Sequence, residues 1–156
     1  MILAPIKFRK LTTDDLKQIL VVERNAFTMP WSAAMMRDSL AAAHTECYGT
    51  FDEDEKLLGY VVISLVPDEL EILSMAVSST HQGQGIGRSL LRKVSERGKK
   101  HKAKQVYLEV RRTNSHAIGL YQKSGFKVIG ERKAYYPSET DAKQREDAVV
   151  MELSLT

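Results

Sequence analysis

The residues whose types and spacing best suit a chemical role form the glycine-rich segment 82–88, between a predicted strand and a predicted helix. Glycine has no Cβ, so the three glycines of this segment would let the backbone approach a ligand closely. The helix that follows would direct unpaired N–H groups and the positive end of its dipole at that ligand, which favours a phosphate or pyrophosphate. We therefore predict an anion-binding site formed by Gln82, Gly83, Gln84, Gly85, Ile86, Gly87 and the positively charged Arg88.

The neighbours of this segment distinguish it from other glycine-rich motifs. A nucleotide-hydrolysing P-loop needs Lys-Ser or Lys-Thr after its last glycine, but Gly87 is followed by Arg88-Ser89. A Rossmann dinucleotide site follows the first strand and has an acidic residue about twenty positions later. Here the acidic residues at 68, 69 and 71 come before the glycines. The remaining alternative, glycines that only allow tight packing, stays open at this point.

The helices and strands predicted around this segment indicate an α+β fold in a single domain, residues 1–156. The short apolar run 72–77 suits a central strand, and the apolar residues of 86–94 recur on one helix face. Capping residues and apolar alternation predict the other helices and strands. The predicted strands are 6–10, 46–51, 58–65, 72–77, 105–111, 126–129 and 148–153, and the predicted helices are 13–27, 33–43, 86–100 and 115–124. Residues 135–147 are expected to be a polar connection.

Composition limits the classes of function. The chain has 156 residues, 43% of them apolar and 28% charged, with no apolar run near the ~20 residues of a membrane span. We expect no membrane partner, and a start without secretory features predicts a cytoplasmic protein. The single cysteine, Cys47, is expected to be buried, and the four histidines lack zinc-ligand spacing, so no metal is expected. A net charge of +3 is too small to indicate DNA binding.

A second motif, in residues 114–126, makes a family resemblance specific. Asn114 begins a predicted helix that stops at Gly125-Phe126, with Tyr121 just before this stop. Together with Gln82-x-x-Gly85-x-Gly87, this pattern resembles the GNAT family of N-acetyltransferases. The resemblance implies a GNAT-like mixed, mostly antiparallel sheet flanked by helices on both faces, and acetyl-CoA as co-substrate. It also implies that Tyr121 donates a proton and that acetyl-CoA is contacted by residues 82–88, Met75, Ala76, Val77 and Asn114.

Both motif residues also have structural explanations. Asn114 would cap a helix in any protein, and a tyrosine at the spacing of Tyr121 is by default a core residue.

Acetyl transfer to an amine places three demands on a protein. The thioester carbonyl must be polarised, which unpaired strand N–H groups can do. An α-amino group with a pKa of about 8 is mostly protonated at neutral pH, so a base helps. The departing thiolate is better released with a proton, which a phenol can supply. Glu109, on the less apolar face of strand 105–111, is the predicted base; the alternative is an ion pair with Arg111 or a lysine.

A narrower resemblance involves both ends of the chain. Residues 23–32, 108–111, 135–137 and 145–148 are similar to the bacterial ribosomal-protein alanine N-acetyltransferases, the RimI group. This implies that the acceptor is a protein N-terminal amine, namely the N-terminal alanine of a small-subunit ribosomal protein. By the same resemblance Trp31, Tyr135 and Tyr136 contact the acceptor, although they could equally be wall or core aromatics. The connection 138–144 is longer than in that group, and loops beside an acceptor site are where specificity changes.

Other functions remain open from the sequence. The same machinery could acetylate a small amine or a lysine side chain, or the chain could be a non-catalytic acyl-CoA-binding module. The basic residues between 92 and 104 favour a solvated helix end. Contact of these residues with the 3′-phosphate of CoA or with ribosomal RNA is the weaker interpretation.

Overall fold

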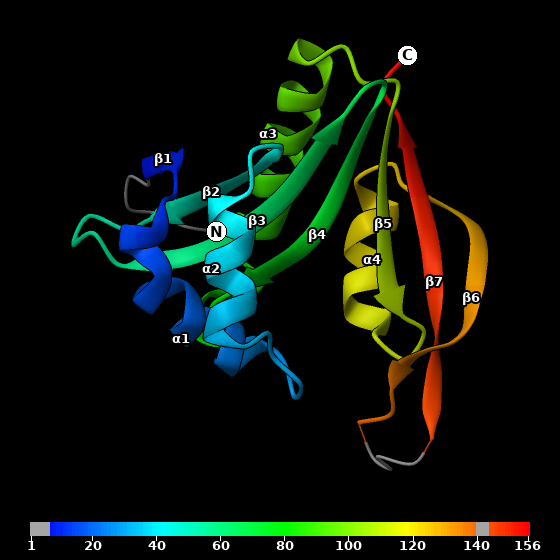
Figure 1. The fold of residues 1–156 in the computed structure, drawn as a ribbon, viewed down its shortest axis with the longest axis horizontal. Helices are drawn as coiled ribbons and strands as arrows, with labels where there is room; N and C mark the ends of the chain where they lie inside the picture. The colour runs from blue at the N-terminus through cyan, green and yellow to red at the C-terminus, as the bar shows by residue number, and fades with distance from the viewer. Residues whose placement is uncertain (1–6, 140–143) are drawn as a thin grey trace.

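The computed structural model describes residues 7–139 and 144–156, which form a seven-stranded sheet with helices packed against it (Figure 1). The strands are β1 (Lys7–Lys10), β2 (Thr45–Phe51), β3 (Leu57–Val66), β4 (Glu69–Val77), β5 (Gln105–Arg111), β6 (Lys127–Pro137) and β7 (Arg145–Ser154). Their order across the sheet is β1-β2-β3-β4-β5-β7-β6. Among these strands β4 and β5 pair in parallel, and all other neighbours pair antiparallel. The predicted mixed, mostly antiparallel sheet is therefore confirmed.

Helices cover both faces of the sheet, as predicted. The helices are α1 (Leu16–Ala26), α2 (Ala33–Ala41), α3 (Ile86–Lys100) and α4 (Ser115–Lys123), and short 3-10 turns, η1 (Thr13–Asp15) and η2 (Ser79–His81), precede α1 and α3. Helices α1 and α2 share one core cluster with the sheet, and α3 and α4 share another. None of these helices, within the described ranges, is long and apolar enough to cross a membrane.

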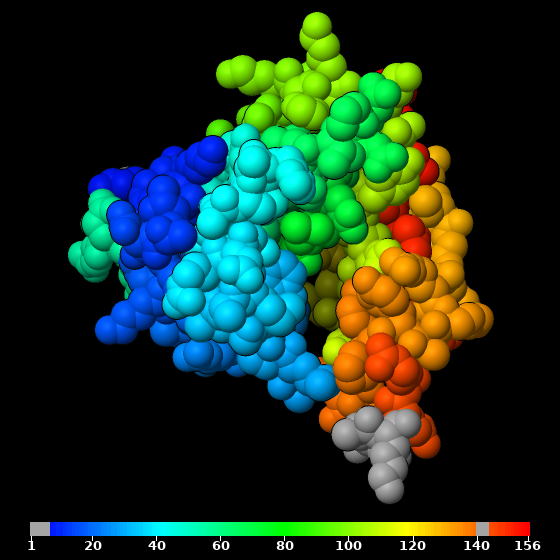
Figure 2. Space-filling model, viewed as in Figure 1, coloured from blue at the N-terminus to red at the C-terminus, as the bar shows by residue number. Residues whose placement is uncertain are grey.

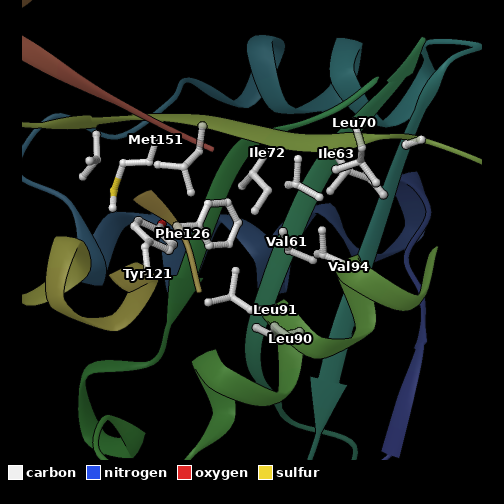
Figure 3. Packing of buried hydrophobic residues seen from close by; sticks show 14 of the residues in the cluster. Val61, Ile63, Leu70, Ile72, Leu90, Leu91, Val94, Tyr121, Phe126 and Met151 are labelled. Carbon is white, nitrogen blue, oxygen red and sulfur yellow. The ribbon is translucent and has the colours of Figure 1, made fainter. Parts of the chain in front are cut away.

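The larger cluster joins α3 and α4 to the middle of the sheet. Leu90 and Leu91 of α3 and Tyr121 of α4 pack with Val61 of β3 and Phe126 (Figure 3). Burial of one such aliphatic side chain stabilises the fold by roughly 1.5–3 kcal/mol. This packing fixes where α3 and α4 begin relative to the strands.

Side-chain caps begin the helices where the sequence predicts them. The hydroxyl of Thr12 accepts a hydrogen bond from the backbone of Asp14, and Ser32 accepts one from the N–H of Met35 at 3.2 Å. The Asn114 side chain accepts one from the N–H of Ala117, also at 3.2 Å. The capping explanation of Asn114 therefore holds, whatever further role the residue has. Helix α2 ends at Ala41 rather than near residue 43.

Strand β4 contains a β-bulge directly after the residues that pair with β5. The pairing of β3 with β4 passes from Val62↔Ser74 to Ile63↔Ile72, so Leu73 is an extra residue. Because a one-residue shift exchanges the faces of a strand, Ile72 packs in the α3–α4 cluster and Ala76 in the α1–α2 cluster. Strands β4 and β5 pair only along Glu69–Ile72 and Gln105–Leu108, and beyond this point they diverge (Figure 1).

The last two strands are longer than the sequence indicates. The expectation that residues 135–147 form a polar connection is wrong, because β6 continues to Pro137 and β7 begins at Arg145. Strand β6 lies at the sheet edge and is mostly exposed, so it lacks the apolar alternation that identifies a strand. Its pairing with β7 is also interrupted near Ala134, whose φ is 49°. Two parts of the sequence predictions lie outside the described residues. They are residues 140–143 of the predicted connection 138–144 and residue 6 of the predicted first strand.

Candidate active site

A cleft of about 680 Å³ opens where β4 and β5 diverge. Its walls come from the end of α1 and the segment leading to α2, from β4 and β5, from the start of α4, and from the end of β6. Figure 2 shows a hollow between the blue-to-cyan surface of the α1–α2 region and the orange surface of β6. Six of the residues predicted from the sequence line the cleft together: Trp31, Met75, Glu109, Asn114, Tyr121 and Tyr136.

Glu109, the predicted base, enters the cleft from β5. The strand alternates buried residues with partly exposed ones, and Glu109 is on the partly exposed face with 19% of its side chain accessible. The Arg132 guanidinium donates from Nη1 to Glu109 Oε1 at 2.7 Å. The ion-pair alternative thus has a partner from β6, and not Arg111 or a lysine. Burial raises the pKa of the nearby Tyr135 phenol, and a hydrogen bond with Glu109 raises it further.

Tyr121, the predicted acid, enters from α4. Its ring is 7% exposed and lies 5.7 Å from the Phe126 ring, so the side chain is also a core residue. Among the described residues none forms a hydrogen bond with its hydroxyl, and the residue contributes to the cleft wall. Burial raises the pKa of this phenol to about 12. Tyr121 is therefore protonated at every physiological pH and has a proton to donate.

The glycine-rich segment 82–88 connects β4 to α3 through η2. Gly83 and Gly85 have φ values of 79° and 85°, a left-handed conformation that favours glycine. Gly85 is the residue before α3, and within the described chain no side chain caps it, so N–H groups of the first turn stay available to an anion. A Cβ at Gly83 or Gly85 would meet nothing within 4 Å. The space beside the backbone at these two positions is therefore open.

Gly87 has a different function from the other two glycines. A Cβ at this position would lie 2.9 Å from Cδ2 of Leu120, so Gly87 allows α3 to pack closely against α4. The tight-packing alternative is therefore correct for this one glycine.

Several predicted site residues lie beside the described cleft lining rather than in it. The side chain of Ala76 faces the α1–α2 cluster, and Val77 packs against the α3–α4 cluster. Tyr135 is 37% exposed and contacts Tyr136 edge to face, with ring centroids 4.9 Å apart. Cys47 is buried as predicted, and burial raises its thiol pKa to about 12.

Tyr136 is held in the cleft wall by Arg111. Arg111 Nη1 donates to the Pro137 carbonyl at 2.5 Å and to Glu146 Oε1 at 3.1 Å, and the guanidinium lies 4.7 Å from the Tyr136 ring. Burial, followed by the nearby Glu109 charge, raises the Tyr136 pKa to about 12. Sequence reasoning did not find the role of Arg111, because its partners come from two strands that follow much later in the chain.

Glu23 is a cleft residue that the sequence patterns identify only as part of a helix. It is 1% exposed and accepts hydrogen bonds from the Trp31 N–H at 3.0 Å, from Ser74 Oγ at 3.2 Å and from the Tyr60 hydroxyl. These bonds connect α1 to β3, to β4 and to the turn before α2. One feature of the sequence could have identified Glu23: it is a charged residue on the same helix face as the apolar residues Ile19 and Leu20 of α1.

Comparison with known proteins agrees with this geometry. Residues 16–126 match the model of the acetyltransferase (GNAT) family. The chain belongs to this family. The predictions of GNAT membership and of an N-acetyltransferase are therefore confirmed.

Individual relatives also support the narrower resemblance. The [ribosomal protein bS18]-alanine N-acetyltransferase of Escherichia coli K12 is 34% identical over 94% of this chain and 95% of its own. The N-alpha-acetyltransferase RimI of Mycobacterium tuberculosis is 34% identical over 85% of both chains. The crystal structure of the ribosomal-protein-S18-alanine N-acetyltransferase from E. coli superposes with a TM-score of 0.88 at 28% identity, covering 97% of this chain and 95% of that one. The similarity to the RimI group is therefore confirmed.

Proposed function

We propose that this GNAT protein transfers the acetyl group of acetyl-CoA to the N-terminal alanine of a ribosomal protein, in the cytoplasm. The observation that carries the proposal is one cleft that contains both a carboxylate, Glu109, and a protonated phenol, Tyr121. The activities named for relatives at 34% identity over most of the chain support this choice of acceptor.

The open geometry around the glycine segment fits acetyl-CoA. Gly83 and Gly85 leave their backbone accessible, and the first turn of α3 offers N–H groups to a pyrophosphate. Arg88 is exposed on that turn and adds a positive charge. Bound acetyl-CoA would supply the thioester that reacts. The bulge ends the pairing of β4 with β5 at Ile72, so the later backbone groups of β4 on this edge can polarise the thioester carbonyl.

Two side chains of the cleft would then move the protons. Glu109 takes a proton from the ammonium of the acceptor, directly or through one water, and leaves an amine that can attack the thioester carbon. A C–N bond forms as the C–S bond breaks. The Tyr121 hydroxyl donates its hydrogen bond, and then its proton, to the sulfur as negative charge develops there. The nitrogen of the new amide gives up its second proton, which returns through water to the Tyr121 phenolate. Trp31 and Tyr136, on opposite walls, would contact the first residues of the acceptor.

Release of CoA with a panel of acceptors tests this proposal. The panel contains short peptides that differ in the first residue, the Ala peptide with a blocked N-terminus and an internal lysine, and free polyamines. Turnover on the Ala peptide and none on its blocked form is the expected result. Turnover confined to polyamines or to the blocked lysine peptide would replace the acceptor assignment by a small amine or a lysine. Tight acetyl-CoA binding without any turnover would support a non-catalytic binding module.

A further inference from the structure

Glu109, which lines the cleft, forms an ion pair with Arg132 of β6. The Nη1–Oε1 distance is 2.7 Å, and the Arg132 side chain is 54% exposed, against 19% for Glu109. The Arg132 guanidinium also lies 4.3 Å from the ring of Tyr135, whose pKa is raised by burial and further by the neighbouring Glu109. The predicted base is therefore already paired with a cation from its own chain.

Arg132 is less constrained than Arg111, the other arginine beside the cleft. Arg111 is 18% exposed and has both a backbone carbonyl and Glu146 as acceptors. Among the described residues Arg132 has one carboxylate partner, Glu109, and it is the last β6 residue paired with β7 before the interruption that precedes Tyr136. Because the Arg132 end of this pair is exposed to solvent, the pair contributes little to stability, and exchange of Arg132 for another cation costs little free energy.

A second carboxylate makes the surroundings of this pair negative. Glu71 lies on β4 opposite Tyr107, two residues before Glu109 on the neighbouring strand. Burial raises the pKa of Glu71, the Glu109 charge raises it further, and the Arg132 charge lowers it. Two carboxylates thus share the field of one guanidinium, which leaves a net negative charge for a cation that arrives from solution.

We propose that Arg132 occupies the position that the α-ammonium group of the acceptor takes in the reaction, and that the acceptor must displace it from Glu109. This inference rests on the proposed function and adds to it a residue that sets acceptor affinity. An N-terminal ammonium group can replace the guanidinium charge for charge, whereas an N-terminally blocked peptide cannot. Arg132 therefore opposes the binding of acceptors that lack a positively charged end.

The test compares Arg132→Gln with Arg112→Gln by steady-state CoA release on the Ala peptide. Arg112 is a matched control because its side chain is 56% exposed and its partners, Glu131 and Asp147, lie outside the described cleft lining, whereas the partner of Arg132 is the lining residue Glu109. Arg132→Gln should lower the KM for the peptide by about two- to fivefold, the range expected from removing one exposed ion pair that competes. The KM for acetyl-CoA should not change. Arg112→Gln and the conservative Arg132→Lys should both keep the wild-type peptide KM, and thermal unfolding confirms that each variant is folded.

Each other outcome has a distinct meaning. A peptide KM that rises in Arg132→Gln would mean that Arg132 binds the acceptor, and an unchanged KM would mean that the ion pair is only structural; either result overturns the inference while leaving the proposed function intact. Absence of wild-type turnover on every peptide overturns the proposed function, and this inference with it.

Discussion

Replacing Tyr121 by phenylalanine separates its chemical role from its structural one. The ring packs beside Phe126 in the α3–α4 cluster, but among the described residues nothing forms a hydrogen bond with the hydroxyl. Tyr121→Phe therefore removes a proton donor without removing a packed ring or leaving a partner unsatisfied.

The two expected effects differ in size. The free energy of unfolding should stay within about 1 kcal/mol of wild type, since at most one net hydrogen bond is affected. A general acid contributes roughly 10²–10⁴-fold to the rate, which is about 2.7–5.4 kcal/mol of activation free energy. Turnover should therefore fall at least a hundredfold while the fold is retained, and the KM for acetyl-CoA should change little.

The assay measures kcat by CoA release and stability by urea unfolding, with Tyr107→Phe as the control. Tyr107 lies on β5 outside the described cleft lining, so its variant should keep wild-type turnover. Because the Tyr121 pKa is raised to about 12, this residue should cause no loss of activity on the alkaline side below about pH 11. Turnover of Tyr121→Phe within twofold of wild type would refute the assignment of the acid.

Three further substitutions test other parts of the structure. Arg97 donates two hydrogen bonds to Glu46, at 2.7 and 2.9 Å, and these lower the Glu46 pKa to about 2. Because the Glu46 pKa is lower in the folded chain than its ordinary value of about 4.5, the ionised carboxylate stabilises the fold above about pH 4.5. This stabilisation is lost as the pH falls through about 2. Glu46→Gln should accordingly lower the free energy of unfolding at pH 7 by roughly 1.5–3 kcal/mol, and in urea titrations the difference from wild type should shrink below about pH 4.5; a constant difference would argue against this pair. Glu23→Ala should cost about 2–4 kcal/mol in the same titration, because the fully buried Tyr60 hydroxyl loses its carboxylate acceptor and keeps only Ser74 Oγ at 3.4 Å, whereas Glu96→Ala on the exposed side of α3 should cost little. Gly85→Ala should raise the KM for acetyl-CoA and lower stability by about 1–2 kcal/mol, because φ is 85° there; Gly119→Ala in α4 is the control, and equal effects of both would contradict the role given to Gly85.

Periodicity predicted the parts of the fold that are buried on one face. Helix α3 and strand β5 agree with their predicted ranges, because apolar residues recur every three to four positions in one and every second position in the other. Strand β6 was underestimated because its residues are mostly exposed and its identity depends on backbone pairing with β7. A sequence contains no comparable signal for that pairing.

The same limit applies to the site. Residue types and the family resemblance were enough to select Glu109, Tyr121 and Tyr136, and all three line one cleft. The Arg132–Glu109 pair joins residues 23 positions apart and depends on the registers of β5, β7 and β6. The bulge at Leu73 was also unpredictable, because a bulge is set by how two strands align and not by one strand alone.

The short pairing of β4 with β5 divides the sheet into two parts, here called lobes, which also share the α3–α4 cluster. Strands β1 to β4 and the glycine segment belong to one lobe, and β5, α4, β7 and β6 belong to the other; four residue pairs join the two along the sheet. The proposed anion site is on the first lobe, whereas Glu109 and Tyr121 are on the second. The distance between a held co-substrate and the groups that act on it is thus set by how these lobes meet, and a small relative rotation would change the reaction geometry without moving any catalytic side chain within its own lobe.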